Sequence, residues 1–169
     1  MRLYDLRTEY RVNPMGLTAK APRFSWKMES QEKDTLQTAY EIHVTDENGK
    51  LVWNSGKKAS DQSVLISYEG EALASETLYT VQVSVADNHG NTESVEGTFE
   101  TGIFDNTEFK AQMITGDFPE EETACPVFGK TFALDKKVKK ARLYATAHGV
   151  YEVTLNRQTV GDYRMAPGW

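Results

Sequence analysis

The sequence predicts an all-β fold in which one β-sandwich is followed by the first strands of a second β domain. Apolar and polar side chains alternate along several runs, which is the pattern of a strand with one buried face. Turn residues separate these runs at short intervals, as in a sandwich of short strands. No long segment shows the apolar period of 3.6 residues that a large helix requires. The 169 residues, 39% of them hydrophobic, are enough for one large domain or two small ones.

Three strands are predicted in the first half of this sandwich. The run PRFSWKM (22–28) alternates, and its apolar side chains are Phe24, Trp26 and Met28. The run AYEIHV (39–44) places Tyr40, Ile42 and Val44 on one face, with Glu41 and His43 on the other. Asn48 and Gly49 then tolerate positive φ, the requirement of a tight hairpin turn. Leu51 and Trp53 continue on the returning strand.

The run LYTVQVSVADNHGN (78–91) predicts a further strand that ends in a turn. Leu73 precedes Tyr79 at its start, which is the pattern of a tyrosine corner, in which the hydroxyl bonds back to the backbone of the preceding loop. The run FETG (99–102) resembles the closing strand of a fibronectin type III domain, with Trp26 as its core aromatic. Residues 1–103 are therefore interpreted as a fibronectin type III-like, or immunoglobulin-like, β-sandwich.

The composition changes after Gly102. Residues 104–127 have weak periodicity and are interpreted as a linker, and residues 128–169 as the incomplete start of a second β-sandwich or jelly-roll domain. Strands are expected at 127–134, 139–147 and 150–156, with a hairpin turn at 156–158. Three or four strands are too few to bury both inner faces of such a domain. Trp169, directly after Pro167 and Gly168, is interpreted as a core residue that has lost its partners.

Charge and composition exclude several classes of function. The formal net charge is −6, and all of it lies in residues 1–103, so binding to a phosphate backbone is not expected. No apolar run is long enough to span a bilayer. If Met1 is the native start, the absence of a secretory signal predicts a cytoplasmic protein. Cys125 is the only cysteine, which excludes an internal disulfide and sites built on paired thiolates.

No combination of residues predicts catalysis or cofactor binding, so no catalytic, cofactor, substrate or metal residue is assigned. His43, His89 and His148 belong to different elements and lack the spacing of metal ligands. Cys125 has no basic neighbour that would favour the thiolate. The acidic run at 120–122 lies in a proline-containing loop, which favours a solvated surface over the two flanking carboxylates of a glycosidase.

Aromatic side chains could stack against sugars, but core packing is the simpler interpretation of most of them. The candidates by residue type are Trp53, Tyr68, Tyr144, Tyr163 and Trp169.

A series of motifs resembles a known family. The segments NPMGL (13–17), PRFSWKMES (22–30), QTAYEIHV (37–44), VWNSGKKASDQSV (52–64) and FETGIFD (99–105) are similar to the N-terminal fibronectin-like module of bacterial α-L-rhamnosidases, glycoside hydrolase family 78. Residues 141–169 are similar to the start of the module that follows it. The family often has tryptophan at the position of Val81, a second aromatic at that of Ala86, and Asn-Gly where Asn156 and Arg157 stand. The last difference predicts a less tight hairpin.

The resemblance implies that the complete protein removes terminal α-L-rhamnose from glycosides with inversion, using two carboxylates of an (α/α)₆ barrel. No part of this sequence corresponds to that barrel. The leading hypothesis is a non-catalytic, scaffolding N-terminal fragment that packs against the catalytic domain and acts on rhamnosides only through the parent enzyme. The alternatives are a free-standing carbohydrate-binding module or a protein-interaction module.

Overall fold

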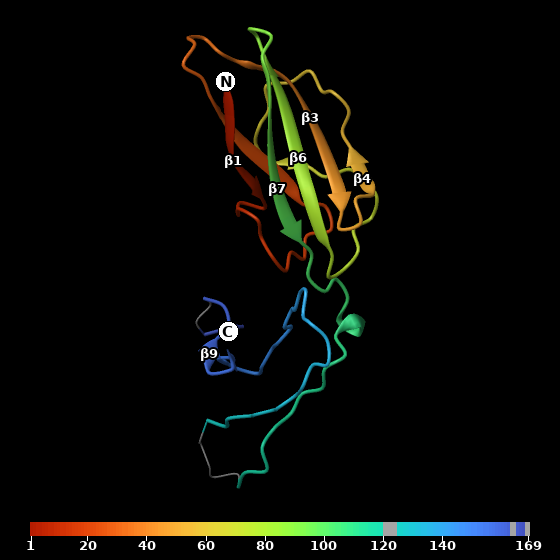
Figure 1. Ribbon diagram of the computed structural model, residues 1–169, viewed down its shortest axis with the longest axis vertical. Helices are drawn as coiled ribbons and strands as arrows, with labels where there is room; N and C mark the ends of the chain where they lie inside the picture. The colour runs from red at the N-terminus through yellow and green to blue at the C-terminus, as the bar shows by residue number, and fades with distance from the viewer. Residues whose placement is uncertain (120–124, 163–164, 168–169) are drawn as a thin grey trace. The chain divides into compact units, whose positions relative to one another are not determined.

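The computed structural model describes residues 1–119, 125–162 and 165–167, and the chain divides into two units (Figure 1). The first unit is Met1–Lys110 and the second is Ala111–Trp169. In the described residues the only helix is a single 3₁₀ turn, Asn106–Glu108, so no helix there is long and apolar enough to cross a membrane. The all-β fold class is confirmed. The predicted linker and domain boundaries stay predictions.

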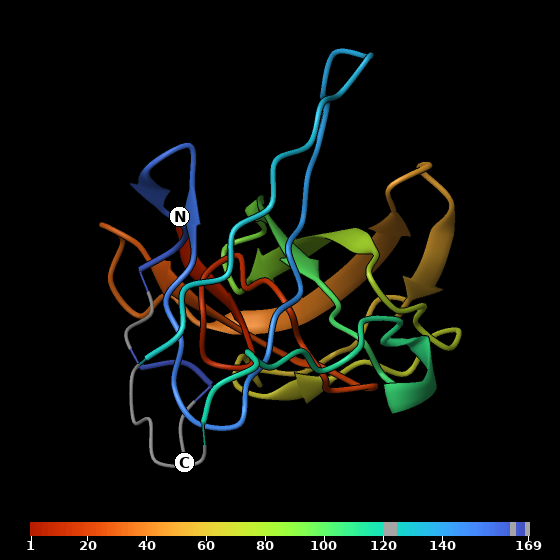
Figure 2. The ribbon, with the colours of Figure 1, turned by 90° about the horizontal axis from the view of Figure 1, so that it is seen from below.

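The first unit is a sandwich of two antiparallel sheets (Figure 1). One sheet has the order β1-β2-β5 and the other the order β4-β3-β6-β7. The strands are β1 (Arg2–Thr8), β2 (Arg23–Glu29), β3 (Gln37–Asp46), β4 (Leu51–Asn54), β5 (Ile66–Ser67), β6 (Leu78–Asp87) and β7 (Thr92–Glu100). The β3–β4 hairpin is visible where orange changes to gold in Figure 2. This arrangement confirms the immunoglobulin-like sandwich.

The core lies between the two sheets and consists of the side chains that alternate inward. Phe24, Ile42, Val44, Val81, Val83, Val85 and Phe99 have no exposed surface. Aromatic rings connect the sheets: Phe24 of β2 lies 6.1 Å from the Trp53 ring and 5.8 Å from the Phe99 ring, measured between centroids. Trp26 is buried, as predicted, and its indole N–H donates to the Gln37 side chain at 3.0 Å.

The predicted tyrosine corner is confirmed. The hydroxyl of Tyr79 accepts a hydrogen bond of 2.9 Å from the backbone N–H of Ala74. A second buried tyrosine, Tyr68, donates its hydroxyl to the Glu71 carbonyl at 2.7 Å. Burial raises the pKa of Tyr68 to about 12, with smaller contributions from Tyr79 and Glu71, so this phenol stays protonated.

The β3–β4 turn differs from the tight turn that the sequence predicted. Of its residues only Gly49 has a positive φ, and a register shift follows Val44. Three residues, 47–49, connect the hydrogen-bonded pair Asp46 and Lys50. Asn48 therefore does not need the left-handed conformation, because the longer loop uses a single left-handed glycine.

The second unit contains fewer strands than predicted. Its only strands in the described residues are β8 (Thr154–Leu155) and β9 (Gln158–Thr159), while 127–134 and 139–147 form none, so those two predictions are wrong. The apolar side chains of these runs find no second layer among the described residues. Phe132 and Leu143 are each 60% exposed, and Leu155 is 53% exposed. Alternation alone does not create a strand where no neighbouring strand accepts its hydrogen bonds.

The β8–β9 hairpin is tighter than its sequence predicted. Asn156 and Arg157 form a two-residue loop, since Leu155 pairs directly with Gln158. Both loop residues have positive φ, 51° and 68° respectively. The expectation that arginine in place of glycine loosens this turn is therefore wrong: Arg157 adopts the left-handed conformation that the turn demands.

The stability of the sandwich is expected to depend on pH through two aspartates that lie in turns. Asp87 accepts hydrogen bonds from the backbone N–H groups of His89 and Asn91 and from the Asn91 amide. Burial of Asp87 opposes ionisation, but these bonds outweigh it, and the pKa of Asp87 lies below its usual value. Backbone N–H groups of Lys50 and Asn48 likewise lower the pKa of Asp46.

A lowered pKa in the folded state means that the unfolded chain binds more protons as the pH falls. We therefore expect the free energy of unfolding to be constant above about pH 5 and to decline below about pH 4, near the ordinary pKa of an aspartate. Urea denaturation at a series of pH values measures this decline. Asp87→Asn should reduce it, and Asp61→Asn, which removes the same charge at an exposed position, is the matched control. A decline of equal size in Asp87→Asn would contradict the assignment to Asp87.

Candidate functional site

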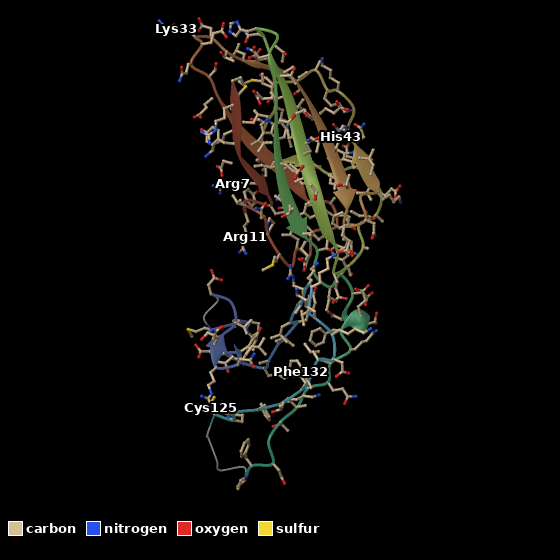
Figure 3. The ribbon with its side chains drawn as sticks, in the orientation of Figure 1. Arg7, Arg11, Lys33, His43, Cys125 and Phe132 are labelled. Atoms are coloured by element: carbon tan, nitrogen blue, oxygen red, sulfur yellow. The ribbon has the colours of Figure 1, made fainter. Side chains whose placement is uncertain are left out.

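The histidines and the cysteine considered in the sequence are divided between the two units, with His43 and His89 in the first and Cys125 and His148 in the second. His43, labelled on β3 in Figure 3, has a glutamate neighbour on its own strand. Its ring lies 3.1 Å from Glu41, and the His89 ring lies 3.5 Å from Glu32. His148 is exposed, as is Cys125. Among the residues that the structure describes, no group of three His, Cys, Asp or Glu side chains could hold a metal ion.

The aromatic candidates separate into core residues and others. Trp53 and Tyr68 are buried and contact each other edge to face, with centroids 5.2 Å apart. Core packing therefore accounts for both rings. Tyr144 is half-buried in the second unit. Tyr163, Trp169 and the acidic run 120–122 lie outside the described residues.

A cavity of about 220 Å³ opens at the side of the sandwich where β4 and β5 are the edge strands of their sheets. We call it the lateral cavity. Its lining combines two rings of the core with polar side chains from the segments that follow β4 and β5. The lining residues are Tyr40, Trp53, Ser55, Lys58, Gln62, Leu65, Ile66, Ser67 and Glu69.

Backbone pairing holds the wall formed by residues 55–62. Tyr40 and Lys58 exchange two backbone hydrogen bonds, of 2.9 and 2.8 Å, although residue 58 lies outside any strand. The Ser55 hydroxyl accepts from the Ile42 N–H and donates to the Gly56 carbonyl, both at 2.8 Å. The Gln37 amide donates to the carbonyls of Ser60 and Gln62. These bonds attach an irregular segment to β3 and fix the backbone from which the exposed Lys58 and Gln62 side chains extend.

The opposite wall depends on the close approach of Gly70 to β4. A Cβ atom at residue 70 would lie 2.5 Å from the Cβ of Trp53 and 2.6 Å from the Val52 carbonyl oxygen. Only glycine allows this approach without displacing the strand. Glu71 continues the contact, with its N–H donating to Val52 at 3.0 Å. Ser67 and Glu69 are thereby held beside the rings of Tyr40 and Trp53.

Several polar groups of the lateral cavity have no partner in the described part of the chain. No hydrogen bond or ion pair there engages the Lys58 ammonium, the Glu69 carboxylate or the Ser67 hydroxyl. Burial raises the pKa of Tyr40, and the charge of Glu69 adds to that rise, which places the phenol and the carboxylate within each other's field. The cavity therefore offers a cation, an anion and two hydroxyls to a bound molecule.

Sequence reasoning did not identify this cavity. The sequence places Tyr40 on one face of its strand and makes Trp53 one of the aromatic candidates, but nothing in it singles out Lys58, Ser67 or Glu69. They lie in segments without periodicity, and only the pairing of residue 58 with β3 brings them together. No short motif in the sequence encodes that pairing.

A second hollow, of about 180 Å³, lies within the second unit and is mainly apolar. Its lining includes Leu143, Ala145, Tyr151, Val153, Val160 and Ala166. Leu143 and Val160 are 60% and 41% exposed, so this surface resembles the uncovered inner face of a β domain more than a ligand site.

The fold and these sites define an immunoglobulin-like β-sandwich module. The chain belongs to the family described as Rha78A-like, N-terminal immunoglobulin domain, whose model matches residues 3–105. A second model, the α-L-rhamnosidase N-terminal domain, matches residues 136–169.

Similar proteins agree with this assignment. An α-L-rhamnosidase of Formosa agariphila is 34% identical over 93% of this chain, and one of an Alteromonas species is 33% identical over 94%. The chain spans about a fifth of these relatives, 19% of the length of each. The solved Streptomyces avermitilis α-L-rhamnosidase, complexed with L-rhamnose, superposes with a TM-score of 0.61 at 35% identity, over 65% of this chain and 11% of that one.

The solved α-L-rhamnosidase of Aspergillus terreus superposes on this chain with a TM-score of 0.75 at 24% identity, which shows the shared fold. The superposition covers 99% of this chain and 20% of that enzyme. The resemblance to the N-terminal region of α-L-rhamnosidases is therefore confirmed.

Proposed function

We propose that this chain is the N-terminal, accessory part of an enzyme that removes terminal α-L-rhamnose from glycosides. The observation that carries the proposal is that two family models of rhamnosidase N-terminal domains match this chain one after the other, at residues 3–105 and 136–169. The chain also corresponds to only about a fifth of its curated relatives. The reaction is thus assigned to the remaining four fifths of the parent enzyme.

In the parent, one carboxylic acid would protonate the glycosidic oxygen while a carboxylate activates a water molecule on the opposite face of the sugar, which gives inversion. This chain contributes scaffolding by packing against the catalytic domain. The second unit supports that role, since its exposed apolar side chains need a cover. Val127 is 96% exposed and Phe128 53%. The expected cytoplasmic location stays a prediction.

The test compares the chain 1–169 with the full-length parent on an aryl α-L-rhamnoside. We expect release of the aryl group by the parent and none by the chain alone, because a glycosidase requires both carboxylates around one bond. An aryl β-D-glucoside serves as the control substrate. Turnover of the rhamnoside by purified 1–169, or inactivity of the parent on every rhamnoside, would overturn the proposal.

A further inference from the structure

We propose that the lateral cavity binds a single neutral pyranose unit of a glycoside. That the pyranose is an α-L-rhamnosyl unit rests on the proposed function, whereas the presence of a sugar site rests on the cavity itself. The site would make the sandwich a carbohydrate-binding module within the parent enzyme.

The size of the lateral cavity fits one sugar ring. Its volume of about 220 Å³ equals that of roughly seven water molecules in the liquid. One ring with its hydroxyls fills such a space, and a second ring would extend into solvent. The cavity therefore selects a terminal unit over the interior of a polysaccharide chain.

The polar groups match the vicinal hydroxyls of a pyranose. A sugar hydroxyl can donate to the Glu69 carboxylate while its neighbour accepts from the Lys58 ammonium, and hydrogen bonds to charged groups are the stronger ones. Ser67 and Tyr40 add hydroxyls that either donate or accept. In the described residues Lys58 and Glu69 do not form an ion pair with each other, although both line the same cavity. A bound sugar can therefore bridge them.

The charges of the lateral cavity favour a neutral ligand. One lysine and one glutamate line it, so its formal charge is balanced. The carboxylate of a uronate would be attracted by Lys58 and repelled by Glu69. A cationic ligand would be attracted by Glu69 and repelled by Lys58. A neutral polyol uses both groups without repulsion.

The apolar part of the cavity lining includes two rigid aromatic rings. Trp53 is only 8% exposed and Tyr40 9%, so each ring presents an edge or part of a face to the cavity. The Trp53 ring is fixed between Phe24, 6.1 Å away, and Tyr68, 5.2 Å away, both measured between centroids. The C–H groups of a pyranose can pack against these rings without loss of side-chain entropy, because both rings are already immobilised in the core.

The test is titration of the chain 1–169 with methyl α-L-rhamnopyranoside, followed by ¹H–¹⁵N NMR and calorimetry. We expect saturable binding with a dissociation constant of about 1 mM, and shifts of the Trp53 indole N–H and of the backbone amides at 58 and 67–69. Glu69→Gln and Lys58→Met should each weaken binding roughly tenfold, because each removes a charged hydrogen-bond partner.

Matched controls are Lys57→Met and Glu93→Gln, which remove the same charges at exposed positions outside the cavity. These two variants should bind like the unmodified chain. Thermal denaturation of all four variants checks that each is folded. Fucose and glucose methyl glycosides test the selectivity of the cavity: binding of these but not of the rhamnoside would support a pyranose site and contradict the rhamnosyl assignment.

The absence of any shift at about 100 mM of all three glycosides, or binding that Glu69→Gln and Lys58→Met leave unchanged, would overturn the sugar site. That failure is distinguishable from failure of the proposed function. If the parent hydrolyses aryl rhamnosides and 1–169 binds no sugar, only the sugar site is wrong. If 1–169 binds the sugar and the parent is inactive on rhamnosides, only the proposed function is wrong.

Discussion

Replacing Phe24 by alanine is expected to lower the free energy of unfolding of the sandwich by about 3–5 kcal/mol. Phe24 is fully buried and connects the two sheets, because it extends from β2 to the rings of Trp53 and Phe99. Its removal takes away the transfer free energy of the ring and leaves a cavity between the sheets. Since small domains are stable by about 5–15 kcal/mol, the variant should be close to unfolding at 25 °C.

Urea denaturation followed by tryptophan fluorescence measures this loss. Phe132→Ala, at a residue 60% exposed in the second unit, is the matched control. It should change the free energy of unfolding of the sandwich by less than about 0.5 kcal/mol. Equal losses in the two variants would show that Phe24 does not hold the sheets together.

Replacing Gln37 by leucine is expected to cost about 2–4 kcal/mol of stability, even though the new side chain is apolar. The Gln37 side chain, in a residue only 9% exposed, accepts from the Trp26 indole at 3.0 Å and donates to the carbonyls of Ser60 at 3.0 Å and Gln62 at 2.8 Å. Leucine leaves a buried indole N–H and these carbonyls without that partner. Hydrogen exchange over residues 58–65 should also accelerate, since this segment loses its attachment to β3.

Gln82→Leu is the control, because Gln82 is exposed on β6 and should change stability by less than about 0.5 kcal/mol. A double-mutant cycle with Trp26→Phe isolates the indole bond: the double variant should lose about 1 kcal/mol less than the sum of the two single variants. Additive losses would contradict a direct interaction between Trp26 and Gln37.

Much of the sandwich could be predicted from the sequence, because its longer strands have one buried and one exposed face. In β6 every second residue is buried, in β3 the buried residues alternate from Tyr40 to Val44, and Tyr79 opens β6 as the corner pattern predicts. β1 was not predicted. It has a register shift between Tyr4 and Arg7, so the buried Leu3 and Leu6 are three residues apart and break the alternation.

The lateral cavity and the second unit show why the remainder could not be predicted. The cavity depends on the contact of residue 58 with β3 and on the approach of Gly70 to β4, and both are long-range contacts without a local pattern. The run 139–147 has the local pattern of a strand but forms none. A strand is stable only where a neighbour accepts its backbone hydrogen bonds, which no alternation within the run itself supplies.

The division of the chain after Lys110 has a consequence for how the parent enzyme is made. All seven strands of the sandwich lie within the first 100 residues, so nothing downstream is needed to complete its two sheets. At a synthesis rate of about 10 residues per second, the seven strands are made within roughly ten seconds of one another, so the sandwich can fold on the ribosome while the residues that follow it are still being produced. The apolar surface of residues 111–169 emerges next, and during that interval it is the part of the nascent chain that chaperones would recognise.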